Sequence, residues 1–150
     1  MIKINKVDVA LLDKLSKIDI DNFEDSWTKE MFKAELEHSN SEYYGLFNDD
    51  ELIGFCGGWL VADEFQVNKI AIDKPHRNKK LGQIFFTYVM QLLKLKNVKK
   101  AIIEVRVSNM PAITVYEKAG FNTVDIRKNY YKNNGENAYV MVRDFSNERY

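Results

Sequence analysis

The spacing of apolar residues divides the chain into helical and extended stretches. Apolar residues recur near helical spacing after Asp8 and again after Thr28, and both residues are of types that cap helices. From residue 42 to residue 73 the pattern shortens to that of strands, with a hairpin-like turn at 48–50. Residues 81–95 return to helical spacing, and the residues predicted to share their apolar face are Ile84, Phe85, Tyr88, Leu92 and Leu95.

The second half of the chain predicts a parallel strand–helix–strand unit. The strands at 66–73 and 101–107 are joined by the helix at 81–95, and strands connected through a helix lie parallel. A short helix capped by Ser108 or Asn109 ends at Gly120, and two closing strands follow. The full set of expected strands is 2–5, 42–47, 52–62, 66–73, 101–107, 122–128 and 138–144.

These elements predict an α/β (α+β) fold with a mixed central sheet of about seven strands and helices on both faces. We expect a single domain over residues 1–145 and a short, loose polar tail over residues 146–150. A chain of 150 residues that is 45% hydrophobic can form a real core without disulfides.

Composition excludes several classes of protein. Lys plus Arg equals Asp plus Glu at 22 each, which argues against general nucleic-acid binding. Cys56 is the only cysteine and lies among apolar residues, so we interpret it as an inert strand thiol in a reducing compartment. His38 and His76 have no ligand spacing, so we expect no metal site. With no signal sequence and no apolar run of about 20 residues, the chain is predicted to be cytoplasmic, with no membrane partner.

A basic loop over residues 77–82 precedes the long helix and is a candidate anion site. The start of a helix presents free backbone N–H groups and the positive end of the helix dipole, which favour phosphates. Arg77, Lys79 and Lys80 add positive charge, and Gly82 lets the backbone approach closely. The alternative is an ordinary solvated basic loop.

Two further side chains are candidates for acid–base chemistry. Glu104 lies in the middle of a predicted strand, where a carboxylate is unfavourable unless it is paired. It either forms a salt bridge with Arg106 on the same face or acts as a general base toward a protonated amine. Tyr116 is either a packing residue or a general acid for a departing thiolate. No serine or cysteine lies in a nucleophile-elbow pattern.

Residues 77–82 match the first and last positions of a known pattern: Arg or Gln, two residues, Gly, one residue, then Gly or Ala. With the order of elements from Ile2 to Phe145, this loop resembles that of the GNAT family of acetyl-CoA-dependent N-acetyltransferases. The chain departs from the family pattern at Lys80, where a glycine is usual. If that position requires a positive φ, the lysine is strained.

Within the family, four segments resemble those of the bacterial ribosomal-protein alanine N-acetyltransferases: Ile103-Glu104-Val105-Arg106, Ser108-Asn109, Tyr116-Glu117-Lys118-Ala119-Gly120-Phe121 and Arg127-Lys128-Asn129-Tyr130-Tyr131. Phe23 and Trp27 fall in a segment that resembles the substrate-side loop of that group. Asn137 stands where the group usually has Asp, which leaves its contact with a peptide ammonium open.

The resemblance implies roles for particular residues. Acetyl-CoA would lie between the strands at 66–73 and 101–107, with Glu104 as the base and Tyr116 as the acid of a direct transfer. The residues implied in cofactor binding are Ile70, Ala71, Ile72, Arg77, Asn78, Lys79, Lys80, Leu81, Gly82, Asn109 and Tyr116. The residues implied in substrate binding are Phe23, Trp27, Tyr131 and Asn137, although packing remains an equal alternative for Phe23 and Trp27.

From the resemblance and the residues together, we expect a protein N-terminal acetyltransferase. The expected acceptor is the N-terminal alanine of a small-subunit ribosomal protein, and no metal is required. One alternative is the same fold acting on a small-molecule amine or a lysine side chain. A second alternative is a non-catalytic acyl-CoA-binding regulatory module, which the departure at Lys80 favours.

Overall fold

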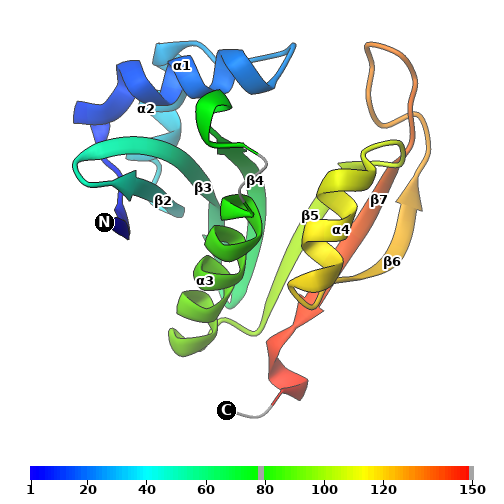
Figure 1. The fold of residues 1–150 in the computed structure, drawn as a ribbon. Helices are drawn as coiled ribbons and strands as arrows, with labels where there is room; N and C mark the ends of the chain where they lie inside the picture. The colour runs from blue at the N-terminus through cyan, green and yellow to red at the C-terminus, as the bar shows by residue number, and fades with distance from the viewer. Residues whose placement is uncertain (78–79, 149–150) are drawn as a thin grey trace.

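The computed structural model describes residues 1–77 and 80–148, and these form one mixed sheet flanked by helices (Figure 1). The strand order is β1-β2-β3-β4-β5-β7-β6, and β4–β5 is the parallel pair in an otherwise antiparallel sheet. The bounds of the strands are β1 Ile2–Lys6, β2 Ser41–Asn48, β3 Glu51–Val61, β4 Glu64–Ile72, β5 Lys100–Arg106, β6 Asn122–Arg127 and β7 Ala138–Asp144. The predicted fold class is confirmed.

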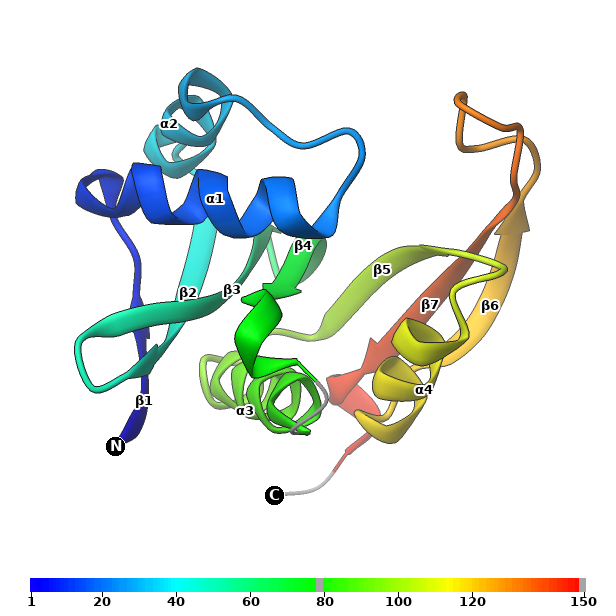
Figure 2. The same cartoon turned by 45° about the horizontal axis from the view of Figure 1, so that its top comes forward.

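The helices cover both faces of the sheet. Figure 2 shows α1 and α2 on one side of the strands and α3 and α4 on the other. The bounds of the helices are α1 Leu12–Asn22, α2 Lys29–Glu37, α3 Leu81–Leu95 and α4 Met110–Lys118. The predicted caps form: the side chains of Asp8, Thr28 and Asn109 accept hydrogen bonds from backbone N–H groups in the following turn.

The buried face of α3 differs from the prediction. Phe85, Phe86, Val89, Met90 and Leu93 are fully buried. The predicted positions 84, 88 and 95 instead have exposed fractions of 59%, 51% and 62%. Because α3 carries large apolar residues on two stripes, periodicity alone does not select the stripe that packs. The buried residues of α3 join one core cluster with inward residues of the sheet, which include Phe65 and Val67 of β4 and Ala101, Ile103 and Val105 of β5.

The parallel strands β4 and β5 pair only at their beginnings. Their registered pairs end at Gln66 and Ile102, after which β4 stays with β3 and β5 stays with β7. A bulge opposite Gly57 and Gly58 bends β4 at this point, as bulges generally do. A side chain on Gly58 would overlap the Gln66 carbonyl oxygen, so the glycine is required for this close approach. The two strands therefore diverge towards their C-terminal ends.

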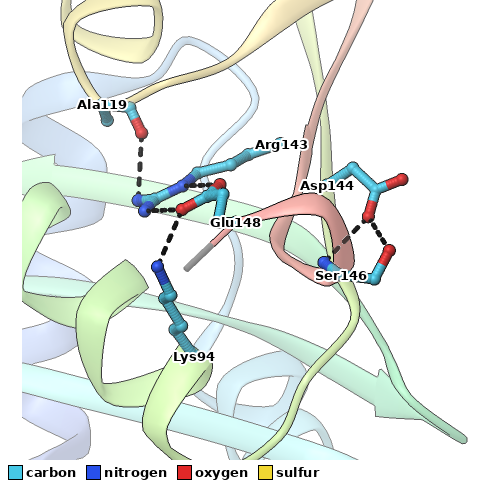
Figure 3. Close-up of polar contacts among 6 residues, drawn as sticks. All are labelled: Lys94, Ala119, Arg143, Asp144, Ser146 and Glu148. Atoms are coloured by element: carbon cyan, nitrogen blue, oxygen red, sulfur yellow. Dashed lines mark hydrogen bonds and ion pairs between the residues drawn. The ribbon is translucent and has the colours of Figure 1, made fainter. Parts of the chain in front are cut away.

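The segment after β7 folds back onto the domain. Glu148 accepts hydrogen bonds from Arg143 (Nε–Oε2 2.9 Å, Nη2–Oε1 2.8 Å) and from Lys94 Nζ (3.1 Å), and Arg143 also reaches the Ala119 carbonyl (Figure 3). The hydrogen bond from Arg143, followed by that from Lys94, lowers the pKa of Glu148 to about 2 in spite of burial. Residues 146–148 are therefore anchored, contrary to the prediction of a loose tail.

Glu148→Gln is expected to lower the free energy of unfolding by about 1–2 kcal/mol at neutral pH, after allowance for solvent screening. Because the folded-state pKa of Glu148 is depressed, its contribution is complete above about pH 4.5 and is lost as the pH falls toward about 2. Urea denaturation at several pH values should show the gap between wild type and variant closing over that range. A gap of the same size at both ends, or an equal effect of Glu37→Gln on exposed α2, would contradict this account.

Candidate active site

A cavity of about 500 Å³ occupies the space where β4 and β5 diverge. The α1–α2 connection borders it on one side, and the β6–β7 loop and the start of α4 border it on the other. The predicted site residues that line it are Phe23, Trp27, Ile70, Glu104, Asn109, Tyr116 and Tyr131. Residues predicted from distant parts of the sequence therefore meet at one place.

Glu104 presents to this cavity a carboxylate oxygen that accepts no hydrogen bond from the described residues. It lies on the face of β5 opposite Ile103 and Val105, as the alternation predicted. Its Oε2 atom is buried and makes no hydrogen bond with the described residues. The nearest cation, Arg127, approaches only to 3.9 Å (Nε–Oε2). A buried carboxylate oxygen without a donor is unfavourable and is positioned to accept a proton or a hydrogen bond from a ligand.

The salt-bridge alternative for Glu104 expected Arg106 as the partner, and that expectation is wrong. Arg106 pairs instead with Glu136 in the β6–β7 loop, at 3.2 Å (Nη1–Oε1). Tyr130 lies beside Glu104, and a hydrogen bond to that carboxylate, followed by burial, raises the pKa of Tyr130 to about 12. The base candidate therefore lies beside a neutral phenol, and the Arg127 guanidinium approaches its Oε2 atom only to 3.9 Å.

A second cavity of about 350 Å³ borders Glu104 on the side of Tyr130 and Tyr131. Its remaining lining comes from β4, at Gln66, Val67 and Asn68. A space of this size with polar walls can hold several waters. Glu104 thus lies between the two cavities and lines both of them.

Tyr116 reaches the cavity from the opposite face of the sheet. Its ring packs against Phe86 (centroids 5.1 Å apart) and Phe121 (6.3 Å) beneath α3 and α4, and 6% of the residue is exposed. Burial raises the pKa of Tyr116 well above the usual value for a phenol. The phenol therefore keeps its proton across the physiological pH range, while its packing fixes the ring in one orientation.

Phe23 and Trp27 combine the two roles that the sequence left open. Both line the cavity, and both rings flank the Lys69 ammonium, with Nζ lying 4.8 Å and 4.1 Å from their centroids. Lys69 is fixed by the fully buried Asp19 (2.8 Å and 2.9 Å), which also accepts from the Trp27 backbone N–H. Burial lowers the pKa of Lys69, although Asp19 opposes this effect. This ion pair orders the α1–α2 connection.

The sequence did not identify Lys69 and Asp19 as site residues. The sequence nevertheless contains a weak indication that both residues are paired. Asp19 lies one turn after Leu15 on the buried face of α1, and Lys69 occupies an inward strand position. Charges at such positions indicate a partner, but the two residues are 50 positions apart and no pattern in the sequence connects them.

The predicted cofactor residues lie along β4 and at the start of α3. Ile70 lines the cavity, whereas the side chain of Ala71 is buried beneath α1 and α2. The Ile72 carbonyl accepts from Asn22 (3.1 Å) and from Arg77 Nε (3.4 Å), and Arg77 also donates to the Asp21 carbonyl (2.8 Å). Arg77 therefore ties the loop to α1. Asn78 and Lys79 lie outside the described residues.

The N-terminus of α3 is open to an anion. No side chain among residues 1–77 and 80–148 caps it, so the N–H groups of its first turn, which begins with Leu81 and Gly82, are not satisfied by a cap from these residues. A side chain at Gly82 would meet only Ile72, at 3.7 Å, so the glycine leaves free space there. Lys80 adopts φ 60° and ψ 10°, the left-handed conformation in which a lysine is strained. The strain expected from the sequence is therefore present.

Lys80→Gly is expected to raise the free energy of unfolding by about 0.5–1 kcal/mol, because relief of left-handed strain exceeds the entropy that glycine adds to the unfolded chain. Lys80→Ala is the matched control, since it removes the same charge but retains Cβ. Thermal or urea unfolding should rank the glycine variant above the alanine variant. Equal stability of the two would show that the conformation at residue 80 carries no strain.

Asn137 lies at the base of the β6–β7 loop. Its Oδ1 atom accepts a hydrogen bond from the Asn129 backbone N–H (2.9 Å), and its carbonyl accepts from Val107 (3.1 Å). The side chain therefore closes the loop, and the cavity wall is formed by Tyr131, Asn133, Asn134 and Glu136. The sequence indicated only Tyr131 among these.

Other candidate chemistry is limited among the described residues. No group of three or more His, Cys, Asp or Glu residues within 1–77 and 80–148 could hold a metal ion. Burial raises the pKa of the Cys56 thiol to about 12, which confirms an inert thiol. In the same part of the chain, no helix is long and apolar enough to cross a membrane.

The fold and this site define a class of protein. The sequence pattern of the acetyltransferase (GNAT) family matches residues 12–121, and the chain belongs to that family. A Bacillus subtilis relative is 40% identical over 131 residues, 87% of each protein, and its name assigns it provisionally to the ribosomal protein bS18-alanine N-acetyltransferases. A Haemophilus influenzae protein with that name is 40% identical over 113 residues, which cover 71% of this chain and 77% of the relative.

Solved structures agree with this assignment. The ribosomal-protein-S18-alanine N-acetyltransferase from Escherichia coli superposes with a TM-score of 0.90 at 26% identity and covers 100% of both chains. Arabidopsis thaliana NAA60, crystallised with acetyl-CoA, superposes with a TM-score of 0.85 over 96% of this chain and 98% of its own. At 16% identity, the second likeness shows the fold alone.

Proposed function

We propose that this chain is an acetyl-CoA-dependent N-terminal acetyltransferase whose acceptor is the N-terminal alanine of ribosomal protein bS18. The acceptor is suggested by the names of the Bacillus, Haemophilus and Escherichia relatives. The single observation that carries the chemistry is the buried Oε2 of Glu104 at the gap between β4 and β5, which accepts no hydrogen bond from the described residues, with the Tyr116 phenol reaching the same gap from the other face. We expect the reaction to take place in the cytoplasm, with no nucleic acid or membrane as a partner.

In this proposal acetyl-CoA enters between the diverging strands. The β4 backbone around Ile70 lies along the pantetheine arm, and the pyrophosphate lies at the uncapped N-terminus of α3. Lys80 adds a positive charge beside that terminus, which partly offsets the strain of its conformation. Asn109, which caps α4 and lines the cavity, lies at the far wall of the same gap.

The charges at the cavity favour an amine acceptor. Its two cations, Lys69 and Arg106, are paired with Asp19 and Glu136. Its acidic residues other than Glu136, which are Glu24, Asp25 and Glu104, make no ion pair shorter than 3.9 Å with the described residues. The uncompensated charge at the mouth is therefore negative, which attracts the ammonium of a peptide N-terminus.

The proposed acetyl transfer accounts for every proton and bond with the residues described above. The ammonium loses a proton to Glu104, directly or through one water, and the free amine attacks the thioester carbonyl to form a C–N bond. A backbone N–H near Ile70 is the expected donor to the oxyanion. Collapse breaks the C–S bond, and Tyr116 supplies the proton for the departing thiolate. The second amine proton, lost as the intermediate collapses, restores the Tyr116 phenol through water, and Glu104 releases its proton to solvent. The products are an N-acetylated peptide, CoA and one proton.

Incubation with acetyl-CoA and a panel of acceptors tests the proposal. The panel contains a peptide with the N-terminal sequence of bS18, the same peptide with a blocked N-terminus, a lysine-containing blocked peptide and a small primary amine. Mass spectrometry should place the acetyl group on the α-amine of the first peptide, with stoichiometric release of CoA. Transfer only to lysine or the small amine would refute the proposed acceptor. Binding of acetyl-CoA without any transfer would indicate the non-catalytic module.

A further inference from the structure

The wall of the cavity formed by the β6–β7 loop is fixed by one side chain from another strand. The Arg106 guanidinium donates through Nη1 to the side-chain oxygens of Asn134 (3.1 Å) and Glu136 (3.2 Å), and through Nη2 to that of Asn133 (3.0 Å). Its central carbon lies 3.9 Å from the centroid of the Tyr131 ring. All four partners line the cavity. Arg106 therefore contacts all four of the described loop residues that line the cavity.

The partners of Arg106 are themselves held by further hydrogen bonds, so the geometry of the wall is specific. Glu136 uses its second oxygen to accept from the Ser108 backbone N–H (2.8 Å), so the carboxylate bridges Arg106 to the residue that follows β5. The Glu136 carbonyl accepts from the Tyr131 N–H (3.1 Å), and the Tyr131 carbonyl accepts from Gly135 (2.7 Å). A planar guanidinium that donates in several fixed directions cannot be replaced by an ammonium without loss of some of these bonds.

The position of Arg106 links this wall to the base candidate. Arg106 lies two residues after Glu104 on the same face of β5, and neither residue is part of the buried core. Residues 132–135 of the loop are exposed and contribute little to that core. Loss of the Arg106 contacts should therefore release the loop locally while the fold persists.

We propose that Arg106 is a positioning residue that holds Tyr131 and the β6–β7 loop at a fixed distance from Glu104, so that the acceptor peptide enters between this wall and the Phe23–Trp27 side of the cavity. The inference rests on the proposed acetyl transfer. It adds to that transfer a residue that acts on peptide binding through the loop and not on the chemical step. A loop that is already ordered raises the affinity for the peptide, because binding then loses no conformational entropy in ordering the loop.

Arg106→Met, which keeps an apolar stem of similar length, tests the proposal. We expect the KM for the peptide to rise by about tenfold or more, with kcat within about threefold and the Kd for acetyl-CoA unchanged. Amide hydrogen exchange over residues 129–137 should become faster, with the thermal midpoint of the domain nearly unchanged. Arg106→Lys should give an intermediate KM, because it keeps the charge but not the fork. Lys132→Met, which removes an exposed cation from the same loop, is the matched control.

The outcomes separate this inference from the proposed function. Faster exchange of the loop amides with an unchanged KM for the peptide would overturn the positioning role alone. Equal losses in kcat, acetyl-CoA affinity and thermal midpoint would also overturn it, because they indicate a general structural role. An Arg106→Lys variant as impaired as Arg106→Met in KM, with wild-type loop exchange, would also contradict it. Failure of the wild-type chain to acetylate any peptide would refute the proposed function itself.

Discussion

Glu104→Gln is expected to lower kcat at neutral pH by about 100-fold or more, which is the usual contribution of a general base. Glutamine preserves the size of the side chain but cannot accept the proton of the ammonium. The Oε2 atom of Glu104 makes no hydrogen bond with the described residues, so its replacement removes only the 3.9 Å contact with Arg127 at that atom. Affinity for acetyl-CoA, measured by calorimetry, should be unchanged.

The pH dependence identifies the role of Glu104 more sharply than the size of the loss. An N-terminal ammonium has a pKa of about 8, so at higher pH a growing share of the acceptor arrives as the free amine and needs no base. The deficit of Glu104→Gln should therefore shrink as the pH rises past that value. Glu117→Gln, on the exposed side of α4, should keep wild-type rates throughout. A full-rate Glu104→Gln enzyme at neutral pH would reject Glu104 as the base.

Tyr116→Phe is expected to lower kcat by about 10- to 100-fold, because the thiolate then leaves without a positioned proton donor. Burial holds the pKa of Tyr116 above the ordinary phenol value, so the donor stays protonated and the rate of the wild-type enzyme should not fall up to about pH 9. Phenylalanine retains the packing against Phe86 and Phe121, so the stability of the variant should be close to that of the wild type.

Steady-state kinetics with saturating peptide measures this effect, and Tyr88→Phe is the matched control because Tyr88 lies half exposed on α3. Rates of Tyr116→Phe within about twofold of wild type would leave Tyr116 with a packing role only. A loss confined to the KM for acetyl-CoA would assign it to cofactor binding without acid catalysis.

The features of the fold that local rules govern were predictable from the sequence. Caps at Asp8, Thr28 and Asn109 satisfy backbone groups within a few residues, and Gly120 ends α4 at φ 93°. The alternation in β5 placed Glu104 and Ile103 on opposite faces correctly, because the period of a strand is independent of its partners.

The features that depend on distant pairing were not predictable. In the salt-bridge alternative, Arg106 is the expected partner of Glu104 because the two are neighbours on one face, whereas the structure pairs it with Glu136 from a loop 30 residues away. The Lys69–Asp19 and Lys94–Glu148 pairs likewise join residues that are 50 and 54 positions apart in the sequence. The buried stripe of α3 depended on which side of an apolar helix meets the sheet, which only the packed fold decides.

The central claim is that a thioester lies in the gap where β4 and β5 part, between Glu104 and Tyr116. A crystal structure with acetyl-CoA bound tests it most directly. The account predicts the thioester carbonyl beyond the last registered pair, Gln66 and Ile102, with the Glu104 carboxylate on its acceptor side, the Tyr116 hydroxyl near the sulfur and the pyrophosphate at the start of α3. An acyl chain bound elsewhere, or a gap closed by side chains with the two residues directed into separate regions, would contradict it.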